Sequence, residues 1–322
     1  MAFFLKNAKF QSIHFDLPLI DSGCEERYHP IGSSIVKTEE GYKLICSAVN
    51  YTQKGGKIFH TVDSDGVFRT KNFLVYLDQS FNILSQKEVT EELARERFPA
   101  CNLEGLQDSR LFEWEGSDWL ACTTTDTNPV GNRQVSLCKL SEDRSLASIQ
   151  VERLVPLKGP NIYRQEKNWL PFTYKGQLQL IQSYAPFTFY IPCFETGESI
   201  IKTAQESSFD FSHFRGSAAP IPFDDGYLML VHEMVSYPDY SRSYLHRFLF
   251  LTKDLEIEKI SDSFAFFHEG IERCRSMTID HSGTNLILPI SIEDCQIDFC
   301  SIPIENVRSL LYPLPNVDAN CF

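Results

Sequence analysis

The stretch Ser109–Asp126, SRLFEWEGSDWLACTTTD, has the pattern of a β-hairpin. A short strand-like segment leads to Gly116, and a second, more apolar segment follows it. Hairpin turns place residues at positive φ, which glycine adopts without steric cost. The stretch therefore predicts two antiparallel strands that are joined by a tight turn at Gly116.

The same pattern occurs four more times along the chain. Each copy has a short strand-like segment, a turn that contains glycine, and a second, more apolar segment. The copies are SSIVKTEEGYKLICSAVN (33–50), NWLPFTYKGQLQLIQSY (168–184), GSAAPIPFDDGYLMLVHE (216–233) and RSMTIDHSGTNLILPISIED (275–294). Further strand-like segments follow most of these hairpins. Each unit can thus supply about four strands, which is the makeup of a propeller blade.

These units predict an all-β fold, a five-bladed β-propeller with few short helices that forms one domain over residues 1–322. A strand near residues 10–15 is expected to close the ring with the last blade, because closure protects open sheet edges. One helix is predicted at Thr90–Phe98, TEELARERF, with Thr90 as its N-cap. A large β-sandwich is the alternative architecture. The blades are expected near residues 30–89, 105–157, 165–204, 214–261 and 270–311.

The composition restricts the class of partner. The chain is 43% hydrophobic and has a net charge of −13, so it can bury a large core and gains nothing from binding nucleic acid or an anionic membrane. Its ten cysteines form no C-x-x-C pair, so no metal site is indicated, and buried thiols are typical of a reducing compartment. No segment has the roughly 20 apolar residues of a transmembrane helix. We expect a cytoplasmic protein.

Charged side chains gather where the predicted hairpins begin and end. Asp108 and Arg110 lie at the start of the second hairpin, Lys167 and Asn168 at the start of the third, and Arg215 at the start of the fourth. In a propeller the inner strands begin around the central channel, so these side chains should converge in one pocket. A salt-bridged turn is the plainer interpretation of Asp108 and Arg110 when they are taken alone.

Four segments resemble the landmarks of glycoside hydrolase family 130, which is related to the mannosyltransferases and phosphorylases of glycosyltransferase family 108. They are QDSR (107–110), EKNW-PF (from 166), GSAAPIPFDDGYLMLVHE (216–233) and SIEDCQIDF (291–299). The resemblance covers roughly residues 29–299. It implies a five-bladed propeller with its site on the axis and an activity on β-mannosides.

The resemblance also implies roles for single residues. Asp108 matches the aspartate of the family's Glu-Asp-Pro-Arg motif and is the expected general acid. Lys167 and Asn168 match a pair that binds phosphate or substrate, and Asp294 matches an aspartate that binds the sugar. The full set of expected substrate- or phosphate-binding residues is Arg110, Arg133, Lys167, Asn168, Arg215, His232, Tyr244 and Asp294.

Three positions depart from the family pattern. Gln107 stands for glutamate, Ser109 for proline, and Glu233 for a small residue. These changes fall in or beside the predicted site, so they bear on the reaction more than on the fold. The choice among phosphorolysis, transfer and hydrolysis therefore stays open at this point.

The chemistry of the glycosidic bond orders these possibilities. Cleavage requires one protonated carboxyl group at the leaving oxygen. An inverting phosphorylase uses phosphate as nucleophile and holds it with cations, whereas an inverting hydrolase needs a second carboxylate to activate water. We expect inverting transfer or phosphorolysis of a mannosyl or similar unit of a carbohydrate substrate. The expected co-substrate is phosphate, a sugar phosphate or a nucleotide sugar, and no other cofactor is expected.

Two alternatives remain. The first is an inverting hydrolase of the same fold, for which Glu166, Glu233 and Glu293 are the candidate bases. The second is a non-catalytic propeller that binds glycans or a protein. Convergence of the predicted residues in one polar pocket would favour an enzyme over the second alternative.

Overall fold

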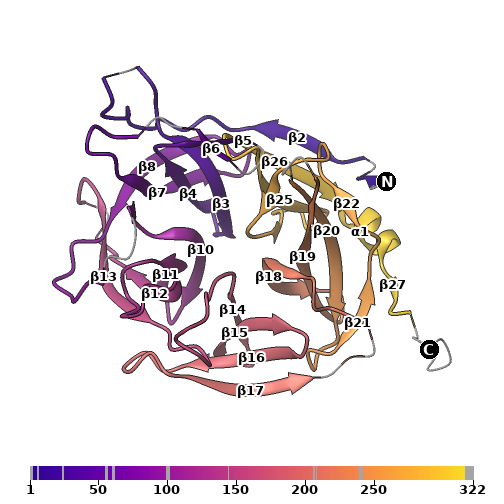
Figure 1. The fold of residues 1–322 in the computed structure, drawn as a ribbon. Helices are drawn as coiled ribbons and strands as arrows, with labels where there is room; N and C mark the ends of the chain where they lie inside the picture. The colour runs from indigo at the N-terminus through magenta and orange to yellow at the C-terminus, as the bar shows by residue number, and fades with distance from the viewer. Residues whose placement is uncertain are drawn as a thin grey trace.

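The computed structural model describes residues 3–315 apart from residues 6, 24, 55–56, 60–61, 99–101, 144, 206, 208 and 239–241. Within this part of the chain, strands predominate and are arranged radially around a central opening (Figure 1). The protein is an all-β propeller, as the hairpin pattern predicts.

Strand pairing places each predicted hairpin at the start of an antiparallel group. The first three groups follow the chain in order. The first consists of β3 (His29–Lys37), β4 (Gly41–Val49), β7 (Phe68–Asp78) and β8 (Ile83–Thr90). The second consists of β10 (Gln107–Trp114), β11 (Ser117–Thr124), β12 (Gln134–Leu140) and β13 (Ile149–Pro156). The third consists of β14 (Leu170–Tyr174), β15 (Gln177–Tyr184), β16 (Phe187–Pro192) and β17 (Ser199–Gln205).

The remaining two groups contain the fourth and fifth hairpins. One consists of β18 (Arg215–Phe223), β19 (Gly226–Ser236), β20 (Arg242–Leu251) and β21 (Ile257–Ile260). In the other, β23 (Glu272–Cys274) and β24 (Thr278–Ile279) both pair with β25 (Asn285–Ile292), which pairs with β26 (Gln296–Pro303).

The N-terminal segment completes the last of these groups. Strand β2 (Lys9–Ser12) pairs antiparallel with β26, opposite Asp298–Ser301. The first and last parts of the chain are thereby joined in one sheet, and the prediction of a closing N-terminal strand is confirmed. Short strands add to the edges: β1 (Phe3–Phe4) pairs with β22 (Phe264–Ala265), and β27 (Tyr312–Pro313) pairs with β21. The β5 (Thr52–Lys54) and β6 (Lys57–Phe59) strands pair with each other.

The hydrophobic core lies between neighbouring groups. One cluster packs Phe112 and Trp119 of the second group against Trp169 and Leu180 of the third. Strand β4 is buried along its length apart from Lys43, because sheets cover both of its faces. This face-to-face packing explains why the second strand of each hairpin is the more apolar one.

The predicted helix at Thr90–Phe98 is wrong. Thr90 is the last residue of β8, and residues 91–98 form no helix. Arg95 and Arg97 instead form ion pairs with Glu91 and with Asp126, which follows β11. The pairs with Asp126 are tertiary contacts, and tertiary context outweighs the local helix propensity of this segment.

One α-helix occurs in the described part of the chain, α1 (Ile304–Leu310), and the sequence pattern did not predict it. It follows β26 directly and buries Ile304 and Val307. At seven residues it is shorter than the prediction at Thr90–Phe98. The described residues contain no helix with the length and hydrophobicity needed to cross a bilayer.

Candidate active site

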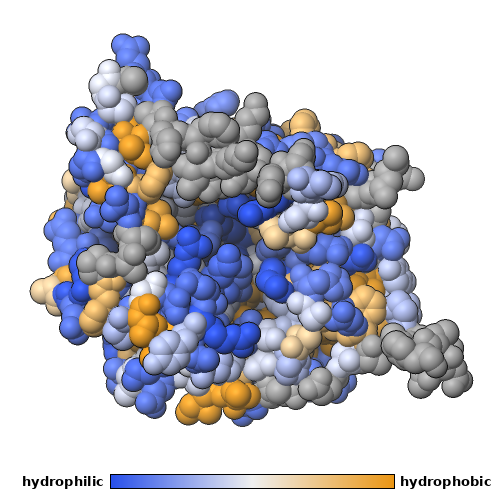
Figure 2. Space-filling view, viewed as in Figure 1, coloured by the Kyte–Doolittle hydropathy of each residue, from blue (hydrophilic) through white to orange (hydrophobic). Residues whose placement is uncertain are grey.

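Hydrophilic side chains surround a hollow at the centre of the propeller (Figure 2). A cavity of about 520 Å³, hereafter the axial cavity, is formed by the ends of β3, β10, β18, β19, β20 and β23 and by the residues before β14. Its polar lining residues are Tyr51, Thr70, Gln107, Asp108, Arg110, Arg133, Lys167, Asn168, His213, Arg215, Ser217, His232, Arg242, Tyr244, Arg273 and Arg275.

The structure brings most of the predicted site residues together. Asp108 lines the axial cavity, and so do seven of the eight predicted binding residues: Arg110, Arg133, Lys167, Asn168, Arg215, His232 and Tyr244. They come from different strand groups and meet only because the inner strands begin around one opening.

The backbone at Asp108 is what directs this carboxylate into the cavity. Its φ is +51°, and the β10–β11 ladder shifts register between Gln107 and Arg110. A bulge of this kind re-aims a side chain, and aspartate is among the residues that tolerate the left-handed conformation. The opening strand of the second hairpin is therefore bent at the residue whose carboxylate lines the axial cavity.

Arg275 holds the carboxylate of Asp108. Its Nη2 lies 2.8 Å from Asp108 Oδ1, and the arginine side chain is only 4% exposed. The guanidinium rests against the backbone of Gly32, where an added Cβ would lie 2.5 Å from Arg275 Cζ. Glycine at position 32 therefore leaves the space that Arg275 occupies.

Opposing effects set the charge of Asp108. Burial alone would raise its pKa, but neighbouring cations outweigh burial and hold the pKa below the ordinary value. These cations are Arg275, Arg273, Arg110 and Lys167. Asp108 is thus a carboxylate at neutral pH.

Arg273 and Arg275 are the main site residues that the sequence analysis did not assign. Arg273 lies in β23 and Arg275 directly follows this strand, and both side chains line the axial cavity. Arg273 Nη1 is 3.0 Å from Asp294 Oδ1, and its guanidinium lies 5.3 Å from the centre of the Tyr244 ring. The alternation Arg-Cys-Arg before the fifth hairpin was the available signal for this pair.

Arg110 uses its donors within the protein. Its guanidinium donates to the backbone carbonyls of Ser217, Arg275 and Gly216. It thereby ties β10 to β18 and to the segment that follows β23 at the centre of the propeller. Burial lowers the pKa of Arg110 to about 10, which still leaves it charged at neutral pH. These contacts give Arg110 a positioning role.

Four further cations surround the cavity, namely Arg133, Lys167, Arg215 and Arg242. Among the described residues, no carboxylate lies within ion-pair distance of any of them. Asp108 is the only acidic side chain in the described lining, against seven arginine and lysine side chains. The axial cavity is therefore strongly positive, although the whole chain has a net charge of −13.

His232 and Tyr51 add neutral polar groups to the lining. Burial, followed by His246 and neighbouring arginines, lowers the pKa of His232 well below its ordinary value, so the ring is neutral. Its Nδ1 lies 2.8 Å from Ser217 Oγ. Burial also raises the pKa of Tyr51, a further lining residue that the sequence analysis did not assign.

Asp294 lies outside the lining, behind Arg273. It is 2% exposed, and burial raises its pKa despite its arginine partner. Its contact is with a lining arginine, so the structure gives it an indirect position where the sequence analysis expected a sugar-binding one.

The three candidate hydrolase bases also lie outside the lining. Glu166 accepts a hydrogen bond from Trp169 Nε1, Glu233 pairs with Arg247, and Glu293 lies 2.9 Å from His268 Nε2. Within the described part of the chain, no group of three or more Asp, Glu, His or Cys residues is arranged to hold a metal ion.

No family model and no curated protein matches the sequence. Several solved structures are similar to the protein. For β-1,2-mannobiose phosphorylase from Listeria innocua the TM-score is 0.56 at 9% identity, covering 88% of this chain and 92% of that one.

Two proteins from Leishmania mexicana are similar as well. For MPT-1, a GDP-Man-dependent mannosyltransferase, the TM-score is 0.54 at 10% identity, covering 93% of this chain and 89% of that one. For MPT-4, a mannose phosphorylase solved with phosphate, the TM-score is 0.53 at 8% identity, covering 94% of this chain and 92% of that one. Identities this low establish the fold alone. The propeller implied by the motif resemblance is confirmed, and the chain shares the fold of these proteins.

Proposed function

We propose that the protein is a carbohydrate-active enzyme that transfers a mannosyl or similar unit, with inversion, to or from a phosphate group. The observation that supports this most is that, among the described lining residues, Asp108 has the single carboxylate and the other ionised side chains are all cations. Phosphate, a sugar phosphate or a nucleotide sugar is the co-substrate, and no further cofactor is required.

The cations favour an anionic ligand. Arg133, Lys167, Arg215 and Arg242 have no carboxylate partner among the described residues, so no acid competes with a ligand for them, although Arg215 Nη1 also donates to two backbone carbonyls. Arginine binds phosphate oxygens in a planar, two-pronged geometry, and charge-assisted hydrogen bonds of this type are roughly twice as strong as neutral ones. A local positive site in a negative protein also attracts the anion from solution.

The charge of Asp108 fits bond formation. In that direction the acceptor hydroxyl oxygen attacks the anomeric carbon, the bond from that carbon to phosphate breaks, and Asp108 accepts the hydroxyl proton. In phosphorolysis the same proton returns to the leaving oxygen while phosphate attacks from the opposite face. A bound phosphate offsets the surrounding cations and raises the pKa of Asp108, which prepares it to act as the acid.

The positions of the other carboxylates bear on hydrolysis. An inverting hydrolase needs a second carboxylate, typically ~6.5–9.5 Å from the first, to activate water. Glu166, Glu233 and Glu293 are each engaged by neighbouring side chains outside the axial cavity. This supports transfer to or from phosphate in preference to hydrolysis.

Two complementary assays test the proposal. In the first, manno-oligosaccharide acceptors are incubated with mannose 1-phosphate or GDP-mannose, and new oligosaccharides are measured. In the second, sugar release from manno-oligosaccharides is measured with and without phosphate. We expect turnover that depends on the phosphate compound. Full turnover with water alone would establish the hydrolase instead, and glycan binding without turnover would establish a non-catalytic propeller.

A further inference from the structure

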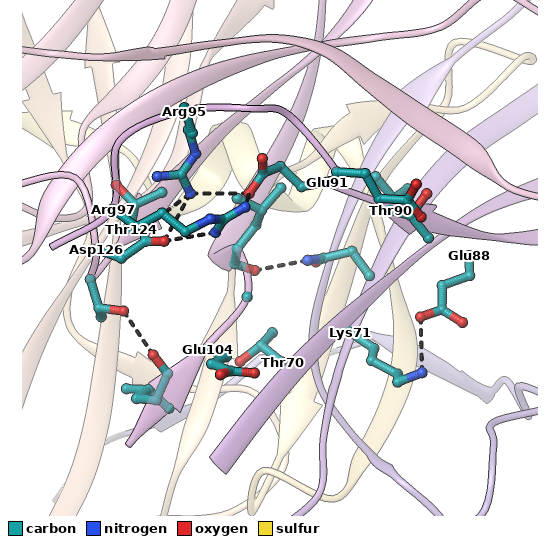
Figure 3. A pocket seen from close by; sticks show the side chains of 17 residues that line it. Thr70, Lys71, Glu88, Thr90, Glu91, Arg95, Arg97, Glu104, Thr124 and Asp126 are labelled. Atoms are coloured by element: carbon teal, nitrogen blue, oxygen red, sulfur yellow. Dashed lines mark hydrogen bonds and ion pairs between the residues drawn. The ribbon is translucent and has the colours of Figure 1, made fainter. Parts of the chain in front are cut away.

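A second cavity of about 580 Å³ lies beside the axial cavity, between residues of the first two strand groups. Figure 3 shows the side chains that line it. We call it the side cavity. Residues of β7, the end of β8 and the segment that follows β8 form one part of its lining. The residues that precede β10 and those that follow β11 form the rest. Its charged lining residues include Lys71, Glu88, Glu91, Arg95, Arg97 and Asp126.

The two cavities share a thin wall. Thr70 lines both of them. Residues 103–106 line the side cavity, and the next two residues, Gln107 and Asp108, line the axial cavity. The backbones touch here, because a Cβ on Gly105 would lie 2.1 Å from the carbonyl oxygen of Thr70. The segment that presents Asp108 to one cavity therefore forms part of the other.

The two cavities have opposite charge. Three cations line the side cavity, against five carboxylates: Glu88, Glu91, Glu92, Glu104 and Asp126. The axial cavity has seven cations and one carboxylate among its described lining residues. A phosphate group is thus directed to the axis and is disfavoured in the side cavity, so the two cavities suit chemically different parts of a ligand.

Four ion pairs between two arginines and two carboxylates form one wall of the side cavity. Arg95 bonds to Glu91 at 3.0 Å and to Asp126 at 2.9 Å, and Arg97 bonds to each of these carboxylates at 2.8 Å. Figure 3 shows these contacts on one side of the cavity and the Lys71–Glu88 pair on another. Each of these acids already has a cationic partner, so the wall does not select a free cation.

This surface matches a neutral polyol. Paired carboxylates and guanidinium groups present acceptors and donors side by side, and Thr70 and Thr90 add hydroxyl groups to the lining. The hydroxyls of Thr124 and Thr125, which also line the cavity, form hydrogen bonds within the protein. A sugar hydroxyl is both a donor and an acceptor, so it can bond to such an alternating surface. Val89, Leu103 and Leu106 supply apolar area for the C–H faces of a sugar ring.

We propose that the side cavity is the subsite for the neutral oligosaccharide chain to which, or from which, the glycosyl unit is transferred. This inference rests on the proposed function, because it takes Asp108 to exchange a proton with the first oxygen of that chain. The oligosaccharide then begins at Asp108 and extends past the shared wall into the side cavity. The phosphate stays among the axial cations.

Filling the side cavity tests this assignment. The variant Glu88→Trp replaces a half-buried lining residue of β8. The matched control is Lys87→Trp, at the preceding residue of the same strand, which lies outside the lining. The probes are manno-oligosaccharides of two to five units. The measured quantity is the ratio of kcat/KM for the tetrasaccharide to that for the disaccharide.

We expect this ratio to exceed one in the unchanged protein, to fall about tenfold in Glu88→Trp, and to stay unchanged in Lys87→Trp. Glu88→Gln, which keeps the size of the side chain, should lower it only about twofold. A ratio that is unaffected by Glu88→Trp, or that falls equally in Lys87→Trp, would overturn the assignment.

A binding measurement separates this inference from the proposed function. Saturation-transfer NMR with the tetrasaccharide reports binding even if no sugar is turned over. A signal that Glu88→Trp reduces and Lys87→Trp leaves intact would support the side cavity as a glycan site in its own right. Absence of binding to the unchanged protein at millimolar tetrasaccharide would overturn it.

Discussion

Arg275 and Asp108 lie 167 residues apart in the sequence and form an ion pair of 2.8 Å at the centre of the propeller. The pair joins β10 in the second strand group to the segment that follows β23 in the last group. It also sets the charge of the residue on which the proposed chemistry depends, since Arg275 is the cation that lowers the pKa of Asp108 most.

Removing Arg275 should shift the pH dependence of the reaction. In Arg275→Met the pKa of Asp108 rises, so the acidic limb of kcat/KM for bond formation moves to higher pH. Arg275→Lys keeps the charge and should shift the limb less. The control is Arg308→Met, which removes an arginine that pairs with Asp224 far from the cavity. Identical pH profiles in all three variants would contradict the role of Arg275.

The same pair predicts a pH dependence of stability. The folded-state pKa of Asp108 lies below the ordinary value of about 3.9. Its contribution to the free energy of unfolding is therefore present above about pH 4 and is lost as the pH falls through the lowered pKa. In Arg275→Met this acid-dependent part should become smaller. Urea unfolding between pH 2.5 and 6 measures it, and an unchanged pH dependence would be the contrary result.

Asp108→Asn should lower turnover by about 10²–10⁴-fold without unfolding the protein. Asparagine tolerates the positive φ at this position. Asp224→Asn is a matched control, because Asp224 also has positive φ and an arginine partner but lies outside the axial cavity. Turnover and melting temperature are measured together. An Asp108→Asn protein with full turnover would exclude the catalytic role.

Gly32→Ala should act through Arg275. The added Cβ would lie 2.5 Å from Arg275 Cζ, so the guanidinium must move away from its present position. Overpacking of this kind costs about 1–3 kcal/mol of stability. In an Arg275→Ala background the same substitution should cost at least about 1 kcal/mol less, as a double-mutant cycle would measure. Additive effects would show that Gly32 and Arg275 are independent.

Lys167→Met should weaken phosphate binding about tenfold or more, because a hydrogen bond to a charged group contributes about 1.5–3 kcal/mol. Lys158→Met is the control, since Lys158 is exposed and lies outside the axial cavity. Calorimetric titration with phosphate measures both affinities at two salt concentrations. Equal phosphate affinity in the two variants would remove Lys167 from the proposed phosphate site.

Glutamine at each candidate hydrolase base provides the last test. Glu166→Gln, Glu233→Gln and Glu293→Gln should each retain turnover within about threefold, because none of these carboxylates lines the axial cavity. A loss of more than about 10²-fold in one of them, with its melting temperature unchanged, would identify a base and favour hydrolysis.

Much of the fold was predictable because its signals are local. A turn glycine between a short segment and an apolar segment specifies a hairpin wherever it occurs, and the hairpin at Gly116 forms as β10 and β11. The helix at Thr90–Phe98 was mispredicted for the complementary reason. Its charges pair with Asp126, which is distant in the sequence, and no local pattern reveals that partner.

The hairpins, the propeller and the residue types that face its axis could be predicted from local patterns, because backbone sterics and strand periodicity act over a few residues. The same patterns pointed to Asp108, Lys167 and Arg215, which line the axial cavity. How these residues are charged and paired is a property of the folded chain alone. Arg110 donates to three backbone carbonyls, Arg275 holds Asp108, and Asp294 lies behind Arg273. Electrostatic interactions depend on distance in space and on burial, and ring closure sets both between residues that the chain keeps far apart.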